Sequence, residues 1–213
     1  TGKTTLLLDA LDDPSLAGTG VIVNEVGAIN IDGATIAAKR SDLKMAMLSN
    51  GCVCCSLMSD LPMTVAALLD EVEDQGLPPL ERLVLETSGL SRPGPILRQL
   101  QGMPVPFRVR TVTTYDAVRG ALNSANHDEA TAQLAAAQII VLTTSDLVAP
   151  ETMLDLRRAM VGINPLARII DLKPGAARAR AAFVGPAPEP SEIPAQDLTL
   201  NGQKHGYSRT FYL

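Results

Sequence analysis

The chain of 213 residues contains no tryptophan, and aromatic residues make up only 3 % of it. Its core must therefore be built from aliphatic side chains and Met, and a hydrophobic content of 46 % suffices for one domain. No apolar run reaches the roughly 20 residues that cross a bilayer. Dense clusters of Lys and Arg are lacking too, and the net charge is −5. These absences argue against a membrane or a nucleic acid as the main partner.

Cysteine is absent everywhere except in one short stretch, NGCVCCS, which holds Cys52, Cys54 and Cys55. A disulfide framework uses an even number of cysteines spread along the chain, so this pattern predicts a protein of the reducing cytoplasm. No signal peptide is visible, although the chain begins at Thr1 and not at a Met.

Three thiols this close together can bind one metal ion. In an extended segment Cys52 and Cys54 project to the same face, and the turn signal Asn50-Gly51 allows Cys55 to join them. Three thiolates about 2.3 Å from a Zn²⁺ leave its fourth position open, which suits metal exchange. Thiolates favour Zn²⁺ or Cu⁺, with Co²⁺ and Ni²⁺ as alternatives. The competing interpretations are three buried apolar side chains and a strained Cys54–Cys55 disulfide.

Short apolar runs alternate with segments of helical periodicity along most of the chain. Nearly continuous Val/Ile/Leu runs are typical of parallel strands covered on both faces. The alternation predicts an α/β fold with a doubly wound, mostly parallel sheet. The expected strands are 20–24, 45–49, 82–86, 108–114, 139–143 and 167–170, and the expected helices are 4–13, 61–76, 94–102, 128–137 and 150–160.

The composition changes after Leu172. Residues 173–197 are rich in Pro and Ala without a clear period, which predicts a linker or an extended tail. The charged pair Arg178 and Arg180 is expected to lie in solvent within it. We therefore expect a domain over 1–172 and a linker or tail over 173–213 that leads toward a further C-terminal domain.

The first residues, TGKTTLLL, match the second half of a P-loop. In the complete motif, backbone N–H groups wrap the phosphates, the Lys reaches the β- and γ-phosphates, and the next hydroxyl ligates Mg²⁺. Gly2, Lys3, Thr4 and Thr5 would take these roles at the N-terminus of a helix. A surface helix that merely begins with Lys is the simpler alternative.

Two strand ends add candidates to this site. Strand 82–86 ends at Glu86, a carboxylate that can hold Mg²⁺ through water, and Gly89 follows without a Cβ to block a γ-phosphate. Strand 139–143 ends at Thr143, after which Asp146 can accept hydrogen bonds from guanine N1–H and N2–H. A strand-end acid and a helix cap are the alternative roles of the two carboxylates.

Taken together, these residues resemble the cobalamin-synthesis-type (CobW) metallochaperone GTPases, relatives of the urease and hydrogenase nickel-insertion GTPases. The resemblance rests on TGKTTLLL at 1–8, VNEVGAINIDG at 23–33, LSNGCVCC at 48–55, LVLETSGLSRPGPIL at 83–97 and IIVLTTSDLV at 139–148. It implies a P-loop NTPase fold (G-domain-like) whose first strand and half of whose P-loop are missing. Lys3 and Glu86 would serve catalysis, and Glu25 and Asp32, in the first switch, are the candidates for orienting the attacking water.

The chain departs from the family pattern in the base-reading motif, where Thr144 replaces a Lys that normally covers the base. Near the first switch, Val23 and Ala28 stand where acids are usual.

The resemblance implies a nucleotide-dependent metallochaperone. Such an enzyme hydrolyses the phosphoanhydride bond of GTP with Mg²⁺ and delivers a transition metal (Zn²⁺, Co²⁺ or Ni²⁺) to a client metalloprotein. Related GTPases often pair across the nucleotide face, which makes a homodimer one implied assembly. The departures leave an alternative open: a non-hydrolysing metal-binding or metal-sensing module with a degenerate nucleotide site.

Overall fold

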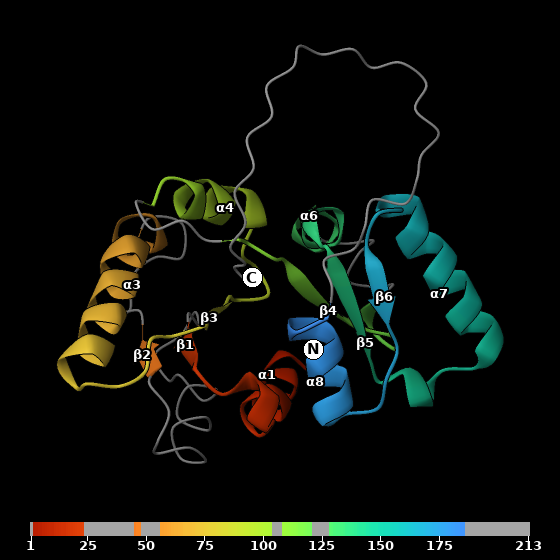
Figure 1. Cartoon of the computed structure of the whole chain (residues 1–213). Coiled ribbons are helices and arrows are strands. Elements are labelled where there is room, and N and C mark those ends of the chain that lie inside the picture. The colour runs from red at the N-terminus through yellow and green to blue at the C-terminus, as the bar shows by residue number, and fades with distance from the viewer. Residues whose placement is uncertain (1, 24–44, 48–55, 104–107, 121–127, 186–213) are drawn as a thin grey trace, which may run out of the picture.

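The computed structural model describes residues 2–23, 45–47, 56–103, 108–120 and 128–185. Two small parallel sheets are sandwiched between helices (Figure 1). The first sheet has the order β2-β1-β3, formed by β1 (Thr19–Val23), β2 (Met45–Met47) and β3 (Arg82–Glu86). The second has the order β4-β5-β6, formed by β4 (Val112–Asp116), β5 (Ile139–Thr143) and β6 (Arg168–Ile170). The predicted doubly wound, mostly parallel α/β fold is confirmed.

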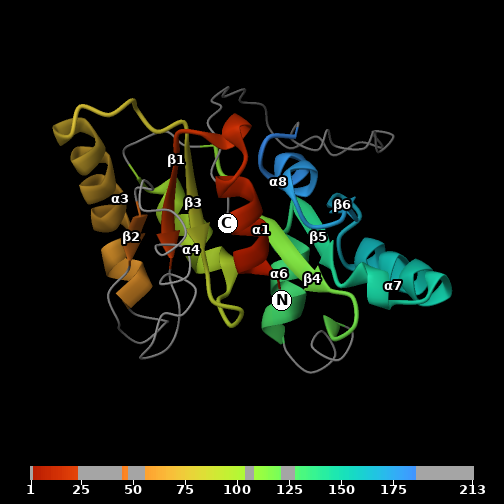
Figure 2. The same cartoon turned by 90° about the horizontal axis from the view of Figure 1, so that it is seen from below.

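The helices form the two outer layers. Helices α1 (Lys3–Leu11) and α8 (Ala176–Phe183) lie side by side on one face of both sheets (Figure 2). Helices α3 (Ser56–Asp74) and α4 (Pro93–Gln101) cover the opposite face of the first sheet. Helices α6 (Asp128–Ala136) and α7 (Pro150–Ile163) cover that of the second. Two 3₁₀ turns, η1 (Pro14–Leu16) and η2 (Ser145–Leu147), follow α1 and β5. Among the described helices, none is long and apolar enough to cross a membrane.

Successive side chains of the central strands point to opposite faces of the sheets and pack into different hydrophobic cores. Val21 and Val23 of β1 pack toward α1 and α8, whereas Ile22 packs toward α3 and α4. In the same way, Val141 of β5 contacts the first layer and Leu142 the second. Because both faces of these strands are buried, most positions are apolar, and the strand sequences are therefore nearly continuous apolar runs.

Several element boundaries differ from the prediction. Strand β4 begins at Val112 rather than at residue 108, because its ladder with β5 starts at the pair of Val112 and Ile139, where the Ile139 N–H donates to the Thr111 carbonyl. Helix α3 begins at Ser56, before the predicted start at residue 61, although Pro62 removes one intrahelical donor. Helix α7 extends to Ile163 and ends where the Asn164 amide donates to three carbonyls at the end of α6.

The prediction of a linker was wrong for residues 176–183, which form α8 and pack into the core. Arg178 is 2 % exposed and not solvated as expected. Its guanidinium donates to Asp9 of α1 at 3.0 Å, and the same carboxylate oxygen accepts the Gly175 N–H at 2.8 Å. Arg180, by contrast, is 52 % exposed at its side chain and pairs with Asp13. Because α8 packs into this core, the domain extends past the predicted boundary at residue 172, whereas the character of 186–213 stays a prediction, since these residues lie outside the described ones.

Strand β3 is the edge strand of the first sheet and β4 that of the second, and these two edge strands face each other (Figure 1). Within the described residues no backbone hydrogen-bond ladder joins them. A cavity of about 60 Å³ lies between them, floored by Leu6 and Leu7 of α1 and by Phe183 of α8. Its polar lining is formed by Lys3, Glu86, Thr87 and Thr114. The carboxyl ends of the strands and the N-terminus of α1 therefore converge at this edge, which is where parallel α/β sheets bind ligands.

Candidate functional site

The start of α1 is held against the end of β5. Gly2 caps the helix in a left-handed conformation with φ 81°, and its carbonyl accepts the Leu6 N–H at 3.0 Å. A Cβ on Gly2 would stand 2.7 Å from Cγ2 of Thr143. Thr143 is itself fixed, because its hydroxyl donates to the Tyr115 carbonyl at 3.3 Å. Glycine is therefore required here on two counts, its positive φ and its close approach to Thr143.

Gly2→Ala is expected to weaken folding by about 1–3 kcal/mol, since it combines a left-handed alanine with an overpacked contact. Denaturant unfolding measures this change. Thr143→Ser removes Cγ2, so in that background Gly2→Ala should cost less than in the parent. Equal costs in both backgrounds would show that the contact with Thr143 contributes nothing.

A cavity of about 340 Å³ opens beside the first turn of α1. Lys3 lines it together with the loop 87–92, strand β4 and helix α6. Lys3 also lines the smaller cavity that contains Glu86. The structure thus brings three predicted site residues, Lys3, Glu86 and Gly89, to one place. Thr4 and Thr5 belong to the same first turn of α1.

The loop 87–92 after β3 is folded into a compact turn. The Ser91 N–H donates to the Ser88 carbonyl at 3.0 Å, and the Leu90 N–H donates to the Ser88 hydroxyl at 3.2 Å. Among the described residues, the Gly89 N–H has no acceptor. The Gly89 N–H is therefore available to an acceptor, and Gly89 has no Cβ that would obstruct an approaching ligand. Such a turn is suited to bind an anion such as a terminal phosphate.

The end of β5 carries the predicted base-reading residues. Thr144 has φ 56°, and it is the only non-glycine residue with positive φ in the described part of the chain. Its hydroxyl donates to Asp116 of β4 at 2.8 Å. Asp146 is exposed in the turn η2 and does not line either of the two cavities described above. A β-branched residue in the left-handed region is strained, and the Asp116 contact helps to hold it there.

Asp116 is a polar group that the sequence did not single out. Burial of its carboxyl raises its pKa, but hydrogen bonds from the Thr144 hydroxyl and from the Arg119 and Val118 N–H groups outweigh this and hold the pKa below its ordinary value. Asp116 therefore stays ionised at the rim of the larger cavity. The pattern TVTTYDA, a strand that ends in an acid, is the signal that could have revealed it.

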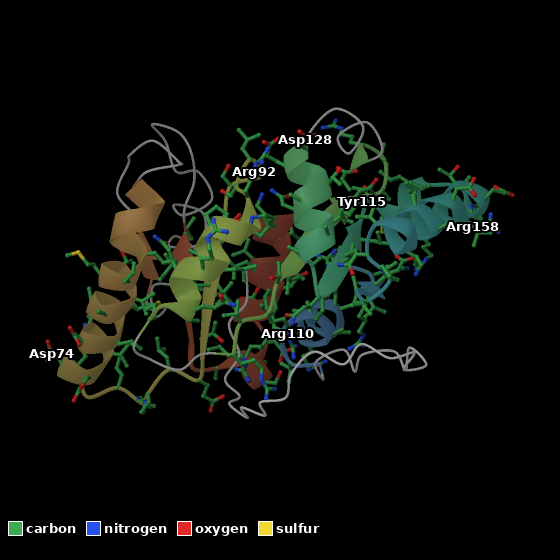
Figure 3. The ribbon with its side chains drawn as sticks, turned by 90° about the horizontal axis from the view of Figure 1, so that it is seen from above. Asp74, Arg92, Arg110, Tyr115, Asp128 and Arg158 are labelled. Carbon is green, nitrogen blue, oxygen red and sulfur yellow. The ribbon has the colours of Figure 1, made fainter. Side chains whose placement is uncertain are left out.

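Two further residues escaped the sequence reasoning. Gln133 and Glu129, one helical turn apart on α6, line the larger cavity and contact the loop 87–92. Arg92 donates to Glu129 at 3.0 Å, and it lies at the end of α6 that begins with Asp128 (Figure 3). Nothing in the local sequence marks these residues, because their partners lie some 40 positions away.

Five predicted site residues fall outside the described residues: Glu25, Asp32, Cys52, Cys54 and Cys55. Their roles stay predictions. Within the ranges that the structure describes, no group of three or more His, Cys, Asp or Glu side chains could hold a metal ion.

Residues 1–171 match the family model described as CobW/HypB/UreG, nucleotide-binding domain. The chain is 36 % identical over 163 residues to the zinc chaperone YeiR of Escherichia coli (strain K12), a match that covers 74 % of this chain and 47 % of that protein. It is 28 % identical over 176 residues to the zinc chaperone CobW of Sinorhizobium sp, covering 69 % of this chain and 48 % of that protein.

The fold is similar to that of a solved structure, the Zn(II)-bound YjiA GTPase from E. coli, with a TM-score of 0.55 and 23 % identity. That match covers 82 % of this chain and 55 % of the other. The chain spans about half of the length of each of these relatives. Because the family model covers nearly all of the part that contains the sheets and the cavities, the chain belongs to the CobW/HypB/UreG family of nucleotide-binding proteins.

Proposed function

We propose that this chain forms the nucleotide-binding domain of a GTP-dependent metallochaperone that carries zinc to a client metalloprotein. The observation that carries the proposal is the convergence of Lys3, Glu86 and Gly89 on one pair of cavities at the carboxyl edge of the sheets. Membership of a family whose relatives include zinc chaperones and a GTPase supports it.

The residues at this edge suit a nucleoside triphosphate. The Lys3 ammonium and the first N–H groups of α1 supply positive charge for the phosphates. The Thr4 hydroxyl and the Glu86 carboxylate are oxygen ligands of the kind that Mg²⁺ takes, directly or through water. A bound Mg²⁺ would neutralise charge on the phosphates. Hydrolysis of the phosphoanhydride bond then depends on positioning and on charge, and Glu25 and Asp32 are proposed to orient the water.

The cargo would be held by Cys52, Cys54 and Cys55 as thiolates, with Co²⁺ or Ni²⁺ as alternative ions. In sequence this stretch lies between the first switch and the loop 87–92. Both flanking segments are proposed to contact the nucleotide, so its state would alter metal affinity. By linkage, metal must then alter nucleotide affinity by the same factor. A reducing cytoplasm, in which thiolates persist, and a homodimer across the nucleotide face remain part of the proposal.

GTP turnover by the full-length protein, measured with and without Zn²⁺, tests the enzymatic part. Turnover that changes with Zn²⁺ is expected. Tight metal binding without any turnover would reject hydrolysis and favour the alternative, a metal-binding or metal-sensing module with a degenerate nucleotide site. Replacing all three cysteines by Ser should remove about one bound metal ion per chain; an unchanged metal stoichiometry would place the metal elsewhere.

Thr144→Lys is expected to raise the preference for GTP over ATP about tenfold, which corresponds to about 1.4 kcal/mol. Lys is not β-branched, so it tolerates φ 56° better than Thr, and its ammonium can pair with Asp116 while its stem covers the base. Competition binding of the two nucleotides measures the ratio. Thr144→Asn is the matched control, since it relieves the backbone without adding a stem. A ratio that Lys leaves unchanged would contradict the assignment of the motif.

A further inference from the structure

Helix α6 supports the loop 87–92 through side-chain hydrogen bonds. The Gln133 amide donates to two of its carbonyls, that of Gly89 at 2.9 Å and that of Ser91 at 2.8 Å. We propose that Gln133 is a positioning residue, which orients this loop for the terminal phosphate of a bound nucleoside triphosphate. The inference rests on the nucleotide site proposed above and deepens it.

The geometry of the turn explains why one amide has this effect. Peptide groups are planar, so the bond from Ser91 to the Ser88 carbonyl also fixes the direction of the Gly89 N–H. Gln133 then fixes the next peptide, through the Gly89 carbonyl, and the one after Ser91. The two carbonyls, which would repel an anion, are engaged, while the Gly89 N–H has no acceptor among the described residues.

Gln133 is itself held in place. Its backbone carbonyl accepts the Thr113 hydroxyl of β4 at 3.1 Å, and the next residue, Leu134, is buried in the core between α6 and the second sheet. The far end of the loop is tied to the same helix through the ion pair of Arg92 and Glu129. Helix α6 therefore presents a rigid edge to the loop, as a preorganised phosphate-contacting segment requires.

A nucleoside diphosphate lacks the γ-phosphate that would meet this loop, so loss of the Gln133 amide should affect the affinities for GTP and for GDP differently. Gln133→Met keeps the length of the side chain but removes both donors. In the full-length protein with Mg²⁺, affinity for a non-hydrolysable GTP analogue is expected to fall about 5- to 30-fold, as for one or two lost hydrogen bonds. Affinity for GDP should change less than about twofold. Amide exchange at Leu90 and Ser91 should quicken in the nucleotide-free protein, because the turn loses its support.

Gln75→Met, the same change at the exposed end of α3, is the control and should alter neither affinity. If Gln133→Met folds poorly, Gln133→Asn, which keeps the amide but shortens its reach, is expected to give the same selective loss. Equal losses for both nucleotides, or unchanged discrimination, would overturn the inference while leaving the nucleotide site intact. Failure of the parent protein to bind either nucleotide would overturn the proposed function and the inference with it.

Discussion

Arg178→Met is expected to lower the free energy of unfolding by about 3 kcal/mol, the low end of the range for breaking a buried ion pair. The change leaves Asp9 of α1 without its guanidinium partner, in a site where the Arg178 side chain is 3 % exposed and the Asp9 side chain 19 %. Two features moderate the cost. The Gly175 N–H still donates to Asp9, and the buried Nε of Arg178, which has no acceptor among the described residues, is removed.

Arg158 of α7 provides the control for this prediction. It also pairs with an acid, Asp155, but the two side chains are 71 % and 76 % exposed. Arg158→Met should therefore cost less than about 1 kcal/mol. Denaturant unfolding of the two variants gives the comparison. Equal losses would mean that burial of the Arg178 pair does not distinguish it from a surface contact.

Lys3→Ala is expected to lower affinity for GTP about 100-fold, because charge-assisted hydrogen bonds to phosphate are among the strongest polar contacts in proteins. Stability should change by less than about 1 kcal/mol, since the helix dipole disfavours a positive charge at the N-terminus of α1 and solvent screens the ion pairs of a half-exposed Lys. Calorimetric titration of the nucleotide and thermal unfolding of the free protein measure the two effects separately.

Lys173→Ala removes the same charge from an exposed position before α8 and serves as the control. It should leave nucleotide affinity within about twofold of the parent, because an exposed charge is screened by solvent and salt. If both Lys variants lost affinity alike, the effect would come from net charge, and Lys3 would have no special contact with phosphate.

The two largest effects differ in how far the sequence could have predicted them. Lys3 was a candidate because a helix beginning with Gly-Lys-Thr-Thr is a local pattern. For Arg178 the sequence predicts a solvated linker, because a stretch rich in Pro and Ala with two arginines has no apolar period. Its partner Asp9 lies 169 positions away, and no local pattern reports such a distance.

The sequence by itself determined the alternation of strands and helices and the residues that end β3 and β5. These follow from the burial of both strand faces and from the chemistry of short motifs, which are local properties. Only the tertiary structure decided that α8 packs against α1, that Asp116 holds Thr144, and that Gln133 holds the loop after β3. The physical reason is that a single polar side chain specifies no partner until the packing of distant elements brings one within hydrogen-bond reach.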